Sequence, residues 1–85
     1  MPGGIGPETE QALIYIKETL ERAGSSLEHA VKCTVFLADI DDFAAMNEVY
    51  SAFFPEAPPA RSTVAVAGLA LGARIEVECI AMAGD

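Results

Sequence analysis

The stretch AVKCTVFLA, residues 30–38, combines β-branched and apolar residues over nearly its whole length. This density is typical of a strand that is covered on both faces, so we predict a largely buried strand here. Segments with helical periodicity lie before and after it. The rest of the chain can therefore be interpreted outward from this strand.

The segment before the strand is predicted to be an amphipathic helix. Apolar residues recur at helical spacing between positions 13 and 23. Pro7 suits the first helical position, and Gly24 supplies a stop. Ser25 and Glu28 have the spacing of a capping box, which predicts one short turn before the strand.

A second helix is predicted after the strand, ended by Pro55. Asp39, Asp41 and Asp42 precede it, and Asp41 is the expected N-cap. Capping and the helix dipole explain these aspartates better than calcium, because no loop has EF-hand spacing. Five apolar residues would line the inner side of this helix: Phe43, Met46, Val49, Tyr50 and Phe53.

Two further strands are predicted at 62–68 and 74–82, joined as a hairpin through the turn at 69–72. The order helix, strand, helix, strand, strand predicts an α/β (α+β) domain with a mixed sheet and both helices on one face. The other face would then need a partner molecule to cover it.

Composition sets limits on the class of protein. The chain has 85 residues, of which 52% are hydrophobic, so a single small domain cannot bury them all and we expect an obligate oligomer. The formal net charge of -8 argues against nucleic-acid binding. No apolar run approaches the roughly 20 residues of a membrane span, and the start lacks a signal pattern, so we expect a cytoplasmic protein.

The cysteine and histidine content predicts no metal site. Cys33 and Cys79 both lie in predicted strands among apolar residues, and we expect buried free thiols. A disulfide is the alternative if the two strands are neighbours. His29 is the single histidine, without a Cys/His cluster around it, and is expected to be a surface turn residue.

Arg61 and Glu76 are the candidate functional residues. Arg61 follows two prolines in PPARSTVAV, residues 58–66, and prolines stiffen the approach to the strand. Glu76 lies in RIEVE, residues 74–78, where apolar residues alternate. A fixed cation facing a fixed carboxylate would suit a small anionic ligand. The alternatives are a structural ion pair or subunit contact for Arg61 and a solvated strand face for Glu76.

Five segments together resemble the RidA/YjgF family, which is also labelled endoribonuclease L-PSP. They cover nearly the whole chain in order, and the combined string is far more specific than any one piece. The segments are VKCTVFLADIDDF (31–43), NEVY (47–50), FFP (53–55), PARS (59–62) and IEVECIA (75–81).

The resemblance implies a chorismate-mutase-like fold, a homotrimer with pockets between subunits, and no cofactor. It implies hydrolysis of reactive enamines and imines, such as 2-aminoacrylate and 2-iminobutanoate, to 2-keto acids and ammonia. By residue, it implies that Arg61 binds the substrate carboxylate, that Glu76 holds or activates the attacking water, and that Asn47 belongs to the pocket. Thr63, also expected at the substrate, stands where many members have cysteine.

The resemblance begins in the middle of the family pattern. Residues 1–6 look like the segment just before the first helix of longer members, so 1–85 is expected to be one partial domain. The upstream Gly-Pro-Tyr-Ser and Ser-Gly-Gln motifs have no counterpart here, and we expect the last strand to pair across subunits. Two other functions compete: a non-catalytic oligomeric module that binds a small carboxylate, and an endoribonuclease, which the acidity disfavours.

Overall fold

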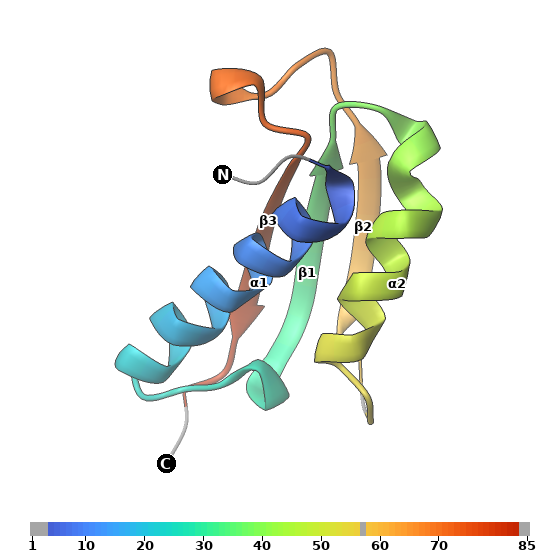
Figure 1. The fold of residues 1–85 in the computed structure, drawn as a ribbon. Helices are drawn as coiled ribbons and strands as arrows, with labels where there is room; N and C mark the ends of the chain where they lie inside the picture. Colours follow the sequence, from blue (N-terminus) through green and yellow to red (C-terminus); the bar gives the residue numbers. More distant parts are fainter. Residues whose placement is uncertain (1–3, 57, 84–85) are drawn as a thin grey trace.

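Helices and strands form two layers in the computed structural model, which describes residues 4–56 and 58–83 (Figure 1). The start of the chain, residues 1–3, lies outside the described residues. The α-helices are α1 (Ile5–Arg22) and α2 (Phe43–Phe53), and the strands are β1 (Ala30–Leu37), β2 (Ala60–Ala65) and β3 (Ile75–Ala81). Three short 3-10 turns are η1 (Leu27–His29), η2 (Ile40–Asp42) and η3 (Ala70–Gly72).

The sheet has the order β2-β1-β3, with β1 in the centre. β2 pairs in parallel with β1, and β3 pairs antiparallel on the other side. The predicted mixed sheet is confirmed, and a strand is present where the sequence placed it at 30–38. Its burial is less complete than predicted, because mainly alternate residues are buried and Val31 is 48% exposed. β1 is the central strand, so its backbone pairs with a neighbouring strand on each edge. Its apolar side chains are covered on one face by the helices.

The predicted hairpin between the last two strands is wrong. The connection after β2 crosses the end of β1 and places β3 on the opposite edge (Figure 1). Both ends of this crossing are tied to the end of β1: Val66 N donates to Leu37 O at 2.8 Å, and Ala38 N donates to Arg74 O at 3.0 Å. The turn expected at 69–72 is present as η3, but it lies within this crossing and does not join two paired strands.

Both helices cover the same face of the sheet, as predicted (Figure 1). Alternate residues of each strand point toward them, because successive strand side chains face opposite ways. The buried core consists of Leu13, Leu27, Ala30, Cys33, Val35, Leu37, Met46, Tyr50, Phe54 and Ile75. In the part of the chain that the structure describes, no helix lies on the other sheet face, where Val64 and Ile80 are exposed.

The second helix begins differently from the prediction. The Asp39 side chain, not that of Asp41, accepts the hydrogen bond, from Asp41 N to Oδ1 at 2.9 Å. A 3-10 turn at η2 therefore precedes α2, and the cap stabilises that turn. The first helix begins at Ile5, so Pro7 lies within its first turn, where no intrahelical N–H bond is lost.

The prediction of free thiols is wrong, because Cys33 and Cys79 form a disulfide. The two residues are directly opposite in the antiparallel register of β1 and β3. Cys33 is fully buried as predicted, whereas Cys79 is only partly buried, and their pairing follows from the neighbouring strands. The bond links β3 covalently to the central strand.

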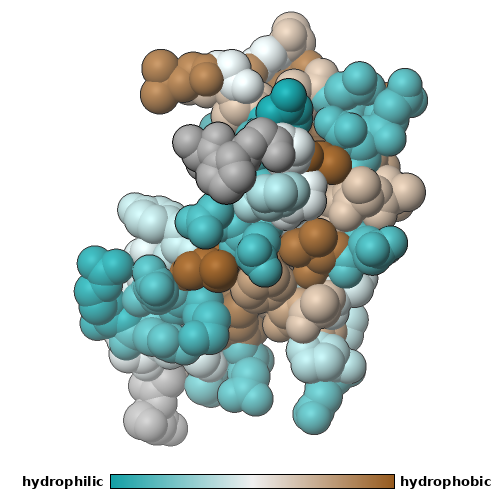
Figure 2. All heavy atoms as spheres, viewed as in Figure 1, coloured by the Kyte–Doolittle hydropathy of each residue, from teal (hydrophilic) through white to brown (hydrophobic). Residues whose placement is uncertain are grey.

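An apolar tip extends from the loop between β2 and β3 (Figure 2). Leu71 is fully exposed and has a φ of 58°, a conformation that a bulky residue rarely adopts. Its side chain adds nothing to the core of this chain. None of the described helices combines the length and the apolar character that crossing a membrane requires.

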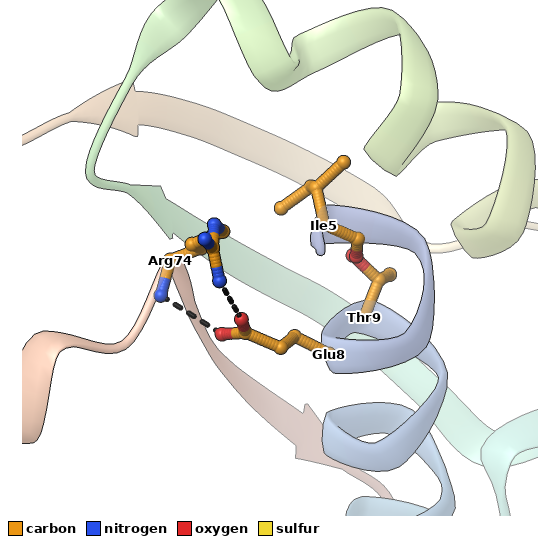
Figure 3. A network of polar contacts seen from close by, with 4 residues as sticks. All are labelled: Ile5, Glu8, Thr9 and Arg74. Atoms are coloured by element: carbon orange, nitrogen blue, oxygen red, sulfur yellow. Dashed lines mark hydrogen bonds and ion pairs between the residues drawn. The ribbon is translucent and has the colours of Figure 1, made fainter. Parts of the chain in front are cut away.

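Glu8 ties α1 to the start of β3 (Figure 3). Its carboxylate accepts two hydrogen bonds from Arg74, one from the backbone N at 2.9 Å and one from Nη1 at 2.6 Å. Glu8 is buried, whereas the Arg74 side chain is half exposed. The backbone N–H and the guanidinium of Arg74 lower the pKa of Glu8 below its ordinary value, against the opposing effect of burial.

We expect Glu8→Gln to remove part of the acid dependence of stability. Because folding lowers the pKa of Glu8, its contribution is fully present above the unfolded value of about 4.3 and is lost as the pH falls through the lower folded value. At pH 7 the substitution should cost about 1 kcal/mol, since Arg74 is partly solvated.

Urea unfolding of both proteins between pH 7 and pH 3 measures this difference. The gap between wild type and Glu8→Gln should close toward pH 3. The exposed Glu10→Gln, in the same helix turn, is the matched control and should leave the profile unchanged. A constant gap at every pH would contradict the role of the Glu8 charge.

Candidate functional site

An open cavity of about 550 Å³ lies where the end of α2 meets the beginning of β2. Among the described residues, Arg61 is the only charged one in its lining. The prolines before β2 form one wall, as expected from a stiff approach to the strand. The lining residues are Asn47, Tyr50, Ser51, Phe54, Pro55, Pro58, Pro59 and Arg61.

Arg61 points toward the helix layer, because it is in register with the buried Cys33 of β1. Its Nη1 donates to Asn47 Oδ1 at 2.6 Å. Its guanidinium carbon lies 4.7 Å from the ring centroid of Tyr50 and 5.3 Å from that of Phe43. The structure thus brings Arg61 and Asn47 together, as the sequence predicted for residues of one pocket.

Phe43 and Tyr50 were interpreted from sequence only as packing residues, and their contact with Arg61 was missed. Positions 43, 47 and 50 lie on one face of α2. Because Asn47 was assigned to the pocket, this spacing could have predicted that the rings of Phe43 and Tyr50 also lie beside the pocket. The Tyr50 hydroxyl is buried and has no hydrogen-bond partner among the described residues. The residue is 3% exposed, and burial raises the pKa of its phenol, with the Arg61 charge acting in the opposite direction.

Thr63 lies two residues beyond Arg61 on the same face of β2. Its Oγ1 is buried and has no hydrogen-bond partner among the described residues. Burying a hydroxyl without a hydrogen-bond partner destabilises the folded chain. A hydrogen bond from a ligand or an ordered water would offset this cost. The residue does not line the cavity itself.

Glu76 does not face Arg61 within one chain. It pairs with Phe36 on the opposite sheet face and is exposed, whereas Arg61 pairs with Cys33 on the helix side. β1 lies between their strands, so strand spacing and rise put the two backbones about 14 Å apart. The predicted pair of facing charges is therefore wrong for a single chain.

His29 agrees with its predicted role as a surface turn residue. It is exposed at the end of η1, and its Nδ1 lies 2.9 Å from Ser26 Oγ. Among the described residues no group of three or more His, Cys, Asp or Glu side chains could hold a metal ion.

The fold and this site define a small α/β domain with an arginine held over an open cavity. The family model described as "Endoribonuclease L-PSP" matches residues 1–83. The chain belongs to this family, the RidA/YjgF family.

Three similar proteins illustrate the match. The protein mmf1, mitochondrial, of Schizosaccharomyces pombe is 51% identical over 94% of this chain and 51% of its own length. The 2-iminobutanoate/2-iminopropanoate deaminase of Capra hircus is 48% identical over 99% of this chain and 61% of its own length. The crystal structure of the E. coli YjgF gene product, 40% identical, has a TM-score of 0.91 over 95% of this chain and 66% of that one. The chain thus spans between half and two thirds of the length of these proteins.

Proposed function

We propose that this chain functions as a RidA-type deaminase, which hydrolyses reactive 2-imino acids and their enamine tautomers. Water adds to the imine carbon, the C–N bond breaks, and a 2-keto acid and ammonia leave. The observation that carries this proposal is the Arg61 guanidinium, held by Asn47 beside an open cavity. The deaminase name of a goat relative with 48% identity supports it.

Arg61 is the proposed clamp for the substrate carboxylate. A guanidinium has five N–H donors in a planar fork, and a carboxylate accepts two of them in parallel. Asn47 engages Nη1 alone among the described residues, so donors remain for a ligand. Thr63 does not line the cavity of a single copy, but its hydroxyl has no partner among the described residues and is proposed to contact the substrate in the assembled site. The reaction requires no cofactor.

Glu76 is the proposed residue that holds and activates the water. Since it lies on the other sheet face from Arg61, we propose that the two meet between copies of the chain in a homotrimer. The bare sheet face with Val64 and Ile80 and the exposed Leu71 support such an assembly. The site then combines the Arg61 of one copy with the Glu76 of another. We propose an aqueous compartment, the cytoplasm, for the assembled protein.

A non-catalytic module that binds a small carboxylate is the second candidate. The separation of Arg61 from Glu76 within one chain favours it, since Arg61 alone can bind but not hydrolyse. An endoribonuclease is disfavoured. The net charge is -8, and two of the five basic side chains, Lys17 and Arg74, are paired with carboxylates.

The test generates 2-aminoacrylate or 2-iminobutanoate enzymatically in the presence of the protein and follows keto-acid formation. We expect formation to accelerate in proportion to protein concentration. Tight binding of 2-oxobutanoate without acceleration would favour the non-catalytic module. If the protein neither binds 2-oxobutanoate nor accelerates keto-acid formation, the proposed substrate class is refuted.

A further inference from the structure

One stripe of α2 encloses the guanidinium of Arg61. Phe43, Asn47 and Tyr50 follow one another at intervals of four and three residues, so their side chains share a helix face. The two rings lie 5.3 and 4.7 Å from the guanidinium carbon, and Asn47 Oδ1 accepts from Nη1 at 2.6 Å. These distances lie within the range of cation–π contacts.

Tyr50 is itself fixed by its surroundings. It is 3% exposed, and its ring centroid lies 4.9 Å from that of Phe54. Its hydroxyl has no hydrogen-bond partner among the described residues. A phenol is already neutral at physiological pH, and burial raises the pKa of Tyr50 further from that range, so Tyr50 offers Arg61 a ring face rather than a charge.

We propose that Phe43 and Tyr50 are positioning residues that fix the plane of the Arg61 guanidinium for a carboxylate ligand. This inference rests on the proposed role of Arg61 as a carboxylate clamp. Asn47 alone fixes one nitrogen and leaves the long side chain free to rotate about that contact. Two ring contacts restrict this rotation, so the remaining donors keep one orientation beside the cavity that Arg61 lines. A clamp that is ordered before binding loses less entropy when the ligand arrives.

The first measurement is the affinity for 2-oxobutanoate, by calorimetry, in matched variants. Tyr50→Leu removes the ring and should weaken binding about 3- to 30-fold, the range of a cation–π contact. Tyr50→Phe keeps the ring and should bind like wild type. Phe43→Leu, at a position that is 37% exposed, should weaken binding about three-fold. Phe53→Leu on the same helix lines a different cavity and is the control, with no expected change.

The second measurement reads the position of Arg61 without any ligand. The Nε–H signal of Arg61 in the proton–nitrogen NMR spectrum, assigned by its loss in Arg61→Lys, should carry an upfield ring-current shift. The shift should be lost in Tyr50→Leu, reduced in Phe43→Leu and kept in Tyr50→Phe and Phe53→Leu. If Tyr50→Leu does not fold, Phe43→Leu decides the result.

An unchanged Arg61 signal and unchanged affinity in the folded leucine variants would overturn the inference. A wild type that binds 2-oxobutanoate but hydrolyses no imine would refute the proposed reaction and leave the inference intact. The two failures are therefore distinguishable.

Discussion

Replacing Arg61 with alanine should abolish most of the acceleration of keto-acid formation from 2-iminobutanoate. The guanidinium is the only charged group that the described residues contribute to the lining of the cavity, and it is held by Asn47. Two charge-assisted hydrogen bonds to a carboxylate would be lost. We expect kcat/KM to fall by about 100- to 1,000-fold, from the usual strength of such bonds. Steady-state assays with imine generated in situ measure this loss.

Two further variants separate charge from geometry. Arg61→Lys keeps the charge but lacks the planar fork, so it should recover only a small part of the activity. Arg22→Ala removes an exposed arginine from the last turn of α1 and should behave like wild type. Equal rates for wild type and Arg61→Ala would dismiss Arg61 as the clamp.

Reducing the disulfide should lower the free energy of unfolding by about 2–4 kcal/mol, the usual range for a cross-link of this kind. Cys33 and Cys79 are 46 residues apart in sequence, so the bond closes a long loop in the unfolded chain. Urea unfolding with and without a thiol reductant measures this change.

The double variant Cys33→Ala/Cys79→Ala is the control, because its stability should not respond to reductant. Thiol titration of the denatured protein gives an independent readout. Protein purified without reductant should show no reactive thiol before reduction and two afterwards. Two reactive thiols before reduction would contradict the disulfide.

The sequence predicted the elements of this fold better than their pairing. Local patterns were sufficient for both helices and for the strand at 30–38. The pairing of β2 and β3 was predicted from their adjacency in sequence, and this failed because each strand pairs with β1 instead. Strand pairing depends on contacts distant in sequence, which periodicity does not report. The disulfide was only the alternative prediction for the same reason, since it requires the β1–β3 register.

The candidate site was predicted in part. The position of Arg61 after two prolines and the family pattern both indicated a cavity-lining cation, and Asn47 lies beside it. The rings of Phe43 and Tyr50 were missed because an apolar stripe on a helix usually indicates core packing. The position of Glu76 could have been predicted from the alternation of residues along β3. Ile75 and Val77 face the helices, so Glu76 must face the other way.

The most direct test mixes two inactive variants, Arg61→Ala and Glu76→Gln, which are unfolded together and refolded so that copies exchange. If each site combines Arg61 of one copy with Glu76 of another, random assembly restores roughly one site in four, because each residue is intact in half of the chains. We predict recovery of about a quarter of the wild-type keto-acid formation from the equimolar mixture, while each variant refolded alone stays inactive. A mixture as inactive as its components, with mixed oligomers present by native mass spectrometry, would contradict a site shared between copies.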